Sequence, residues 1–123
     1  MVTTQRKRIS IAEVGDVWVV TFSDARLTDT RDDKHRVNEI GNELWDLVRV
    51  DGYRKLILNF ESVTYMDSQM LGKLITLEKL VRGINGKLVL STMSPEIYQV
   101  FDITKLNRLF HITENKTDAL TSF

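Results

Sequence analysis

The sequence contains no cysteine and no long apolar run. Without cysteine there is no disulfide framework, no thiolate nucleophile and no cysteine-ligated metal site. No apolar run reaches the ~18 residues needed to span a bilayer, and the N-terminus lacks the apolar stretch of a signal peptide. We therefore expect a cytoplasmic protein without a membrane partner.

An excess of charge of either sign is also missing, because the 17 basic and 17 acidic side chains cancel. A protein that binds nucleic acid through its phosphates usually presents a strongly basic surface. We therefore expect no nucleic-acid partner. One small basic cluster, residues 6–8, is interpreted as a solvated N-terminal flank.

Catalytic motifs are absent as well. The sequence has no glycine-rich phosphate loop, no nucleophile elbow and no cluster of metal ligands. His111 lies in an apolar segment typical of a structural imidazole, whereas His35 lies in a charged helix start and is expected to be solvated. Asp32 and Asp33 are interpreted as acids at a helix N-terminus. We expect no enzyme, no cofactor and no metal.

The residues that are present fit one compact domain. The chain has 123 residues, of which 42% are hydrophobic, and this is enough to bury a core. No repeat, linker or low-complexity tract interrupts it. We therefore predict a single domain over residues 1–123.

The first half of the chain predicts a hairpin and a helix. β-branched runs at residues 9–14 and 17–22 flank a Gly-Asp turn, which is typical of a hairpin. The second run is apolar at nearly every position, as in a strand covered on both faces. Apolar side chains at helical spacing then predict a helix over residues 33–50, which an Asp-Gly pair ends.

The second half alternates between strands and helices. Strands are predicted at residues 54–60, 87–91 and 109–112, and helices at residues 68–82, 95–104 and 115–122. Ser94 and Pro95 form a strong helix start. The order predicts an α/β fold with a mixed sheet, antiparallel at the leading hairpin and parallel in the strand–helix–strand units after it. A receiver domain is disfavoured, because no acidic pair follows the opening strands.

An ordered series of motifs runs through residues 56–120. An apolar strand and a short loop lead to Asp67-Ser68, which opens a helix with Leu71-Gly72 in its first turn. An Asn-Gly turn, a strand, a Ser-Pro helix start and a closing helix and strand follow. This series resembles the STAS domain family, specifically the anti-sigma-factor antagonists of bacterial partner-switching systems. The N-terminal half matches in element order more than in residues.

The resemblance implies a phosphorylation switch. Ser68 stands at the family's phosphoacceptor position and would be phosphorylated by a serine protein kinase of the histidine-kinase-like ATPase class, which doubles as the anti-sigma factor. The unphosphorylated form would bind this kinase and free a sigma factor, and the phosphorylated form would let go. A phosphatase is the other implied partner, and the protein is expected to be a monomer or a weak dimer.

Two segments depart from the family pattern. Gln69 and Met70 stand where the family has Ser or Thr followed by Gly, and Met70 adds bulk where a kinase needs close approach. Residues 23–29 replace a segment of Gly-Glu-Leu-Asp type, which leaves the partner contacts of that region open.

A phosphate on Ser68 would lie at a helix N-terminus, where free N–H groups and the helix dipole favour it. It would therefore act through charge at a docking surface rather than by unfolding. The residues predicted to bind the partner are Asp24, Asp67, Gln69, Met70, Gly72 and Lys73. Three alternatives stay open: a simple helix cap at Asp67 or Ser68, a scaffold without phosphorylation, and a sensor of a small ligand.

Overall fold

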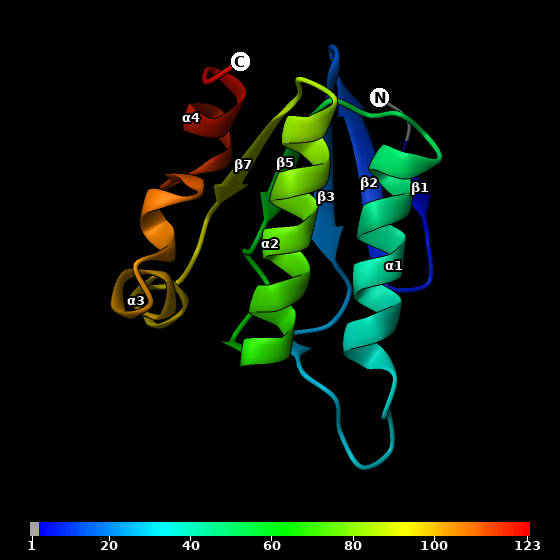
Figure 1. The fold of residues 1–123 in the computed structure, drawn as a ribbon, viewed down its shortest axis with the longest axis vertical. Coiled ribbons are helices and arrows are strands. Elements are labelled where there is room, and N and C mark those ends of the chain that lie inside the picture. The colour runs from blue at the N-terminus through cyan, green and yellow to red at the C-terminus, as the bar shows by residue number, and fades with distance from the viewer. Residues whose placement is uncertain (1–2) are drawn as a thin grey trace.

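The computed structural model describes residues 3–123 and contains a six-stranded sheet, shown in Figure 1. In spatial order, its strands are β1 (Thr3–Gln5), β2 (Ile9–Val14), β3 (Val17–Phe22), β5 (Lys55–Asn59), β7 (Lys87–Ser91) and β8 (His111–Thr113). The pairs β1–β2 and β2–β3 are antiparallel, and the pairs β3–β5, β5–β7 and β7–β8 are parallel. The predicted α/β fold with a leading hairpin is confirmed.

Two long helices cover one face of this sheet. α1 (Arg36–Arg49) and α2 (Ser68–Gly83) lie side by side there (Figure 1). They pack on the sheet because each helix buries one stripe of apolar side chains against it. α3 (Pro95–Ile103) and the short 3-10 helix η1 (Leu106–Arg108) connect β7 to β8. Both long helices begin at the end of the molecule where the parallel strands end, so their N-termini share one surface.

Aromatic rings tie α3 to the main core. Phe22, Phe60, Phe101 and Phe110 form a chain with successive ring centroids 5.2, 6.5 and 5.6 Å apart. Tilted and edge-to-face pairs of this kind each contribute roughly 0.5–1.5 kcal/mol beyond their buried area. The chain explains why the third helix, although short, stays packed against the sheet.

The opposite face of the sheet carries a smaller core. Ala119 of α4 (Lys116–Leu120) packs there with Val17, Ile57 and Val89. Side chains of β3 therefore alternate between two buried layers, which accounts for its nearly continuous apolar sequence.

Three short strands were not predicted. β1 extends the sheet beyond the hairpin, and β4 (Arg26–Leu27) pairs in parallel with β6 (Tyr65–Met66) to form a separate two-stranded sheet. β6 lies inside the segment expected to be a loop. Strands of two or three residues are too short to produce an alternating pattern that could be read from the sequence.

The start of α1 also differs from the prediction. The helix begins at Arg36 rather than at residue 33, because the Asp33 carboxylate pairs with Arg8 and Arg36 at 2.8 and 3.2 Å. The N–H group of Val37 donates instead to Oδ1 of Asp29, at 2.9 Å. Asp29 therefore satisfies a donor of the first turn, a role that the sequence assigned to Asp32 and Asp33.

The basic cluster at residues 6–8 is not a solvated flank, and that interpretation was wrong. Arg6 pairs with Asp51, and Lys7 pairs with Glu39. The side chain of Arg8 is only 13% exposed and pairs with three carboxylates. The cluster holds the turn between β1 and β2 against the segments before, within and just after α1.

The last strand is displaced by two residues from the predicted range of 109–112. It begins at His111, because Leu109 and Phe110 close the preceding turn and Phe110 is buried in the core. His111 is exposed rather than enclosed, and its Nε2 lies 3.3 Å from the hydroxyl of Ser122.

Candidate functional site

The two-stranded sheet joins segments that are far apart in the sequence. Leu27 of β4 and Met66 of β6 pair and are buried, so they anchor the sheet in the core. The other pair, Arg26 and Tyr65, is exposed, and the guanidinium carbon of Arg26 lies 4.6 Å from the centroid of the Tyr65 ring. This pairing places residues 23–29 next to the start of α2.

Asp67 caps α2 and links it to that segment. Its backbone is extended, and its Oδ1 accepts the N–H group of Met70 at 3.0 Å. Its Oδ2 accepts the hydroxyl of Thr28 at 2.7 Å. Both carboxylate oxygens are therefore satisfied, and the predicted helix start at Asp67-Ser68 is confirmed with Asp67 as the cap.

Ser68 is the first residue of α2 and is exposed. Along residues 3–123, no side chain or backbone group is hydrogen-bonded to its hydroxyl. The N–H groups of Ser68 and Gln69 belong to the unpaired first turn of a 16-residue helix, which has no acidic residue in that turn. The Ser68 hydroxyl is thus accessible beside the positive end of a helix dipole.

Met70 does not contribute to the exposed surface, contrary to the sequence interpretation. It is 0% exposed, because it lies on the same helix face as Leu74, Leu77 and Val81, which pack on the sheet. Its bulk therefore fills the core and does not obstruct the approach to Ser68. Gln69 is exposed, so it is the departure from the family pattern that a partner would meet.

A shallow hollow lies between α1 and α2, next to Ser68. Asn38, Trp45, Gln69, Gly72, Lys73 and Thr76 line it. The indole N–H of Trp45 donates to the carbonyl of Lys73 at 3.1 Å, and Nζ of Lys73 lies 5.0 Å from the centroid of the Trp45 ring. A Cβ atom at Gly72 would meet nothing within 4 Å, so this position leaves the helix surface bare.

Comparison with known proteins decides the family. Residues 33–119 match the family model of the STAS domain. The chain belongs to the STAS domain family. The anti-sigma-B factor antagonist of Staphylococcus aureus (strain NCTC 8325 / PS 47) is 34% identical over 82 residues, which cover 67% of this chain and 75% of that protein.

Solved structures share the fold of this STAS domain at low sequence identity. An anti-sigma-factor antagonist (STAS) domain protein from Planctomyces limnophilus is 19% identical, with a TM-score of 0.76, and the match covers 93% of this chain and 95% of that one. SpoIIAA in its unphosphorylated form is 17% identical, with a TM-score of 0.67, and the match covers 93% and 94%. SpoIIAA of Bacillus has also been solved in its phosphorylated form, with the same TM-score of 0.67 at 19% identity and coverage of 93% and 97%.

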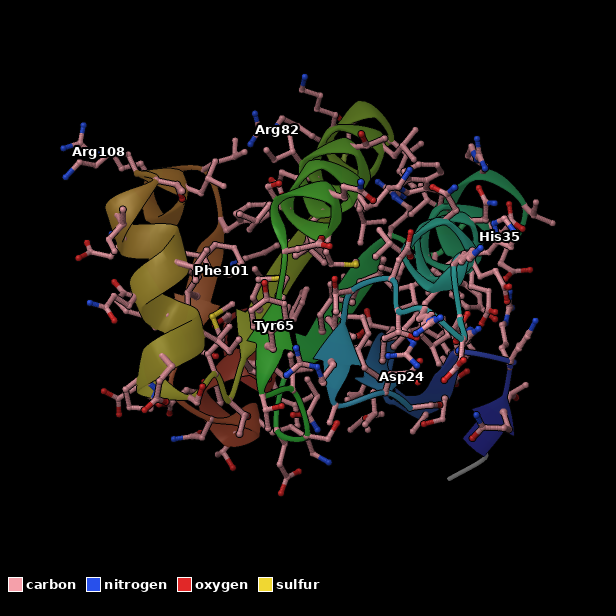
Figure 2. The ribbon with its side chains drawn as sticks, turned by 90° about the horizontal axis from the view of Figure 1, so that it is seen from below. Asp24, His35, Tyr65, Arg82, Phe101 and Arg108 are labelled. Atoms are coloured by element: carbon pink, nitrogen blue, oxygen red, sulfur yellow. The ribbon has the colours of Figure 1, made fainter. Side chains whose placement is uncertain are left out.

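Asp24 of the STAS domain lies in an ion cluster at the side of this surface. Its carboxylate pairs with Arg8 at 3.4 Å and Arg36 at 3.6 Å, and its side chain is 20% exposed. Figure 2, seen from the end where α1 and α2 begin, places Asp24 to one side of Tyr65 and Phe101 to the other. The structure thus gives Asp24 a structural role in fixing residues 23–29.

The cluster also shifts the titration of its carboxylates. For Asp33, partial burial raises the pKa, but hydrogen bonds from Arg8 and Arg36 outweigh it and hold the pKa below its usual value. A hydrogen bond from Lys7 is the largest cause of the lowered pKa of Glu39, with Arg8 adding to it. Both carboxylates are therefore charged at neutral pH and hold β1 and β2 against α1.

Sequence reasoning missed several residues of the surface. Asn38, Trp45 and Thr76 line the hollow, and Thr28 holds the cap. Only Trp45 had a signal, because it lies beside the apolar stripe of its helix. The others are polar residues whose role follows from the pairing of β4 with β6 and of α1 with α2.

Two other kinds of site can be checked over residues 3–123. No helix in this part of the chain is long and apolar enough to cross a membrane. In the same residues, no group of three or more His, Cys, Asp or Glu side chains is placed to hold a metal ion.

Proposed function

We propose that this STAS domain is an anti-sigma-factor antagonist that switches partners through Ser68. When Ser68 is unphosphorylated, the domain binds an anti-sigma factor that is also a serine kinase of the histidine-kinase-like ATPase class. When Ser68 is phosphorylated, the complex dissociates, and a phosphatase reverses the change. We propose that binding, phosphorylation and dephosphorylation take place in the cytoplasm.

One observation carries the proposal: Ser68 is exposed at the first position of α2, and Asp67, not Ser68, caps the helix. A phosphate added to the Ser68 hydroxyl would therefore break no contact on which the fold depends. The unpaired N–H groups of the first turn favour its charge. The name of the Staphylococcus relative supports an anti-sigma factor as the partner, and the existence of SpoIIAA in an unphosphorylated and a phosphorylated form supports a switch of this kind.

The surface proposed to bind the partner surrounds Ser68. It comprises the exposed parts of Tyr65, Gln69, Gly72 and Lys73, together with the hollow between α1 and α2. A bare Gly72 allows another chain to approach the helix closely. Asp67 contributes indirectly, by fixing the helix start, and Asp24 fixes the neighbouring segment.

Charge can operate this switch without a large conformational change. Phosphorylation adds about −1.5 to −2 charges at neutral pH, next to the carboxylate of Asp67. Docking a partner over that site would require desolvation of the phosphate and would bring like charges together. A loss of about 3–4 kcal/mol weakens binding by two to three orders of magnitude, which is enough to release a partner.

A quantitative pull-down from lysate of the source cells tests the proposal. The baits are the wild type, Ser68→Ala, Ser68→Asp and Thr117→Asp. Thr117 is exposed near the N-terminus of α4, at the opposite end of the molecule, so its variant is a matched control for added charge at a helix start. We expect a histidine-kinase-like ATPase to be retained by every bait except Ser68→Asp.

A second step tests phosphorylation directly. The captured ATPase is incubated with ATP and the purified domain, and the modified residue is identified by mass spectrometry. Phosphate on Ser68, absent from Ser68→Ala, is the expected result. If all four baits retain the same partners and Ser68 stays unmodified, the domain is a constitutive scaffold and the switch is refuted.

A further inference from the structure

The lysine in the hollow beside Ser68 has a fixed position. The stem of Lys73 lies over Gly41 of α1, where an added Cβ atom would be only 2.9 Å from Cδ of the lysine. Trp45 contacts the same lysine twice, because its indole N–H group donates to the Lys73 carbonyl and its ring centroid lies 5.0 Å from Nζ. Two residues of α1 therefore hold the ammonium group at the junction of the two long helices.

No carboxylate neutralises this ammonium group. Within residues 3–123, Lys73 forms no ion pair. On α1, Glu39 and Glu43 bind the turn between β1 and β2, and Asp46 pairs with Arg49. On α2, no acidic residue lies three or four positions away from Lys73. The structure thus fixes a positive charge in place without supplying its counter-ion.

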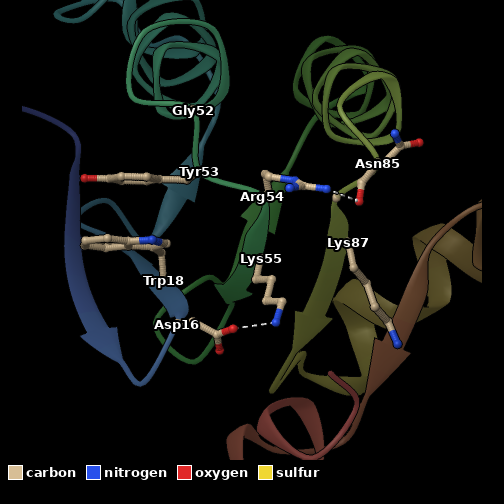
Figure 3. A pocket seen from close by; sticks show the side chains of 9 residues that line it. Asp16, Trp18, Gly52, Tyr53, Arg54, Lys55, Asn85 and Lys87 are labelled. Atoms are coloured by element: carbon tan, nitrogen blue, oxygen red, sulfur yellow. Dashed lines mark hydrogen bonds and ion pairs between the residues drawn. The ribbon is translucent and has the colours of Figure 1, made fainter.

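The cations of another pocket, shown in Figure 3, differ in this respect. That pocket lies at the opposite end of the sheet, where the parallel strands begin, and Arg54, Lys55 and Lys87 line it. Lys55 pairs with the carboxylate of Asp16, and the other two cations donate to backbone carbonyl groups. Their charged ends therefore have partners within the molecule, whereas that of Lys73 faces the hollow.

The rest of the hollow fits a single negative charge. Among the described residues that line it, Lys73 is the only one with a charge, and Asn38 and Gln69 contribute neutral amide groups that can donate hydrogen bonds. Gly72 leaves the adjacent helix surface bare. A carboxylate carries one charge on two oxygens, so it matches one ammonium group flanked by amides.

The openness of the hollow favours a carboxylate that belongs to a protein. A small free acid would meet one partly exposed lysine, and an ion pair in contact with water contributes little. A carboxylate on a partner surface is held in place by the surrounding contacts, which also exclude water from the pair. The occupant that fits the hollow is therefore an Asp or Glu side chain of a partner protein.

We propose that the anti-sigma factor places an aspartate or glutamate side chain in this hollow and pairs it with Lys73. This inference rests on the proposed function and adds the chemistry of the partner surface. Lys73 follows Ser68 by five residues, which is about 7.5 Å along the helix axis. A phosphate on Ser68 would thus lie within about one Debye length of the partner's carboxylate and would repel it. The acidic side chain that recognises the unphosphorylated domain would then help to release the phosphorylated one.

Carbodiimide cross-linking tests the contact directly, because it joins a lysine amine to a carboxylate in contact with it, with loss of water. The sample is the wild-type domain in complex with the histidine-kinase-like ATPase captured in the pull-down. We expect mass spectrometry to find Lys73 joined to an Asp or Glu residue of the ATPase. Lys116, which is exposed near the start of α4 at the other end of the molecule, should form no such link.

Calorimetric titration with the purified ATPase measures the contribution of the charge. Lys73→Met keeps an unbranched stem over Gly41 and removes the ammonium group, and its urea midpoint checks that the fold is retained. We expect this variant to raise the Kd about tenfold and to reduce the dependence of the Kd on salt, which a purely structural role would leave unchanged. Lys116→Met, the matched control, should change the Kd less than twofold.

The outcomes separate this contact from the switch. If Lys73→Met binds as tightly as the wild type and Lys73 forms no cross-link, while Ser68→Asp still releases the ATPase, the inference is overturned and the switch stands. If Lys73→Met weakens binding but Ser68→Asp does not, the contact stands and the switch is refuted. If no bait captures an ATPase of this class, the proposed function and this inference are both refuted.

Discussion

Alanine at two glycines should change stability in opposite directions. Gly72 lies inside α2, where a Cβ atom would meet nothing within 4 Å. Alanine in a helix interior is favoured over glycine by about 0.8–1.0 kcal/mol, and here no packing cost opposes that gain. We therefore expect Gly72→Ala to stabilise the domain by up to about 1 kcal/mol.

Gly86 is the opposite case. A Cβ atom there would lie 2.4 Å from the Arg54 carbonyl oxygen and 2.9 Å from Cγ1 of Val81. The carbonyl cannot retreat without lengthening its 2.7 Å hydrogen bond from Lys87, which lies next to the first residue pair of β5 and β7. Overpacking costs about 1–3 kcal/mol, and a weakened hydrogen bond adds about 1 kcal/mol. We expect Gly86→Ala to cost about 2–4 kcal/mol.

Urea unfolding followed by circular dichroism measures both changes. The two free energies of unfolding should differ by roughly 3–5 kcal/mol if the slopes with urea stay equal. Gly83→Ala is a useful control, because that position is also open and ends the same helix. A stable Gly86→Ala variant, or a destabilised Gly72→Ala variant, would refute the steric reasoning for both positions.

Three further predictions concern the helix that begins at Ser68 and the ion cluster around Arg8. Met70→Ala should lower the free energy of unfolding by about 2–4 kcal/mol in urea, because Met70 is fully buried. Thr28→Val and Asp67→Ala should each cost about 1 kcal/mol, and a double-mutant cycle should give a coupling of similar size, whereas Thr28→Ser should behave like the wild type. Arg8→Met should reduce the acid sensitivity of the urea midpoint between pH 7 and pH 3. Arg8 helps to hold the pKa values of Asp33 and Glu39 in the folded state below those of the unfolded chain. These carboxylates therefore stabilise the folded state above about pH 4, and this stabilisation is lost as the pH falls through their folded-state pKa values. Without Arg8, less stability remains to be lost on acidification.

Much of the fold could be predicted because its elements have strong local signals. β2 and β3 match the predicted hairpin, and β7 matches residues 87–91. The Ser94-Pro95 start of α3 is confirmed, with the Ser94 hydroxyl accepting the N–H group of Ile97. These features depend on neighbours in the sequence, so the sequence contains enough information to place them.

The details of the site depend on contacts between distant residues. Thr28 and Asp67 are 39 positions apart, and nothing in either segment indicates their hydrogen bond. The orientation of Met70 follows from which face of α2 meets the sheet, and the broad apolar side of that helix leaves the face ambiguous. Arg8 was misread because charged side chains near a terminus are usually solvated, whereas three carboxylates converge on it here.

The position of Ser68 depends on a chain of contacts that begins in the first strands. Arg8 of the β1–β2 turn holds Asp24, β4 continues from that segment to Thr28, and Thr28 holds the cap of α2. A phosphate at Ser68 would be added next to the last link of this chain, where Asp67 already carries a charge. Since Asp67 is bound on both oxygens, it cannot turn away, and the added charge must be accommodated by the exposed side of the helix start. Under the proposed switch, the effect of a phosphate on Ser68 would therefore be directed outward, to a partner docked on that surface, and would need no change in the core beneath it.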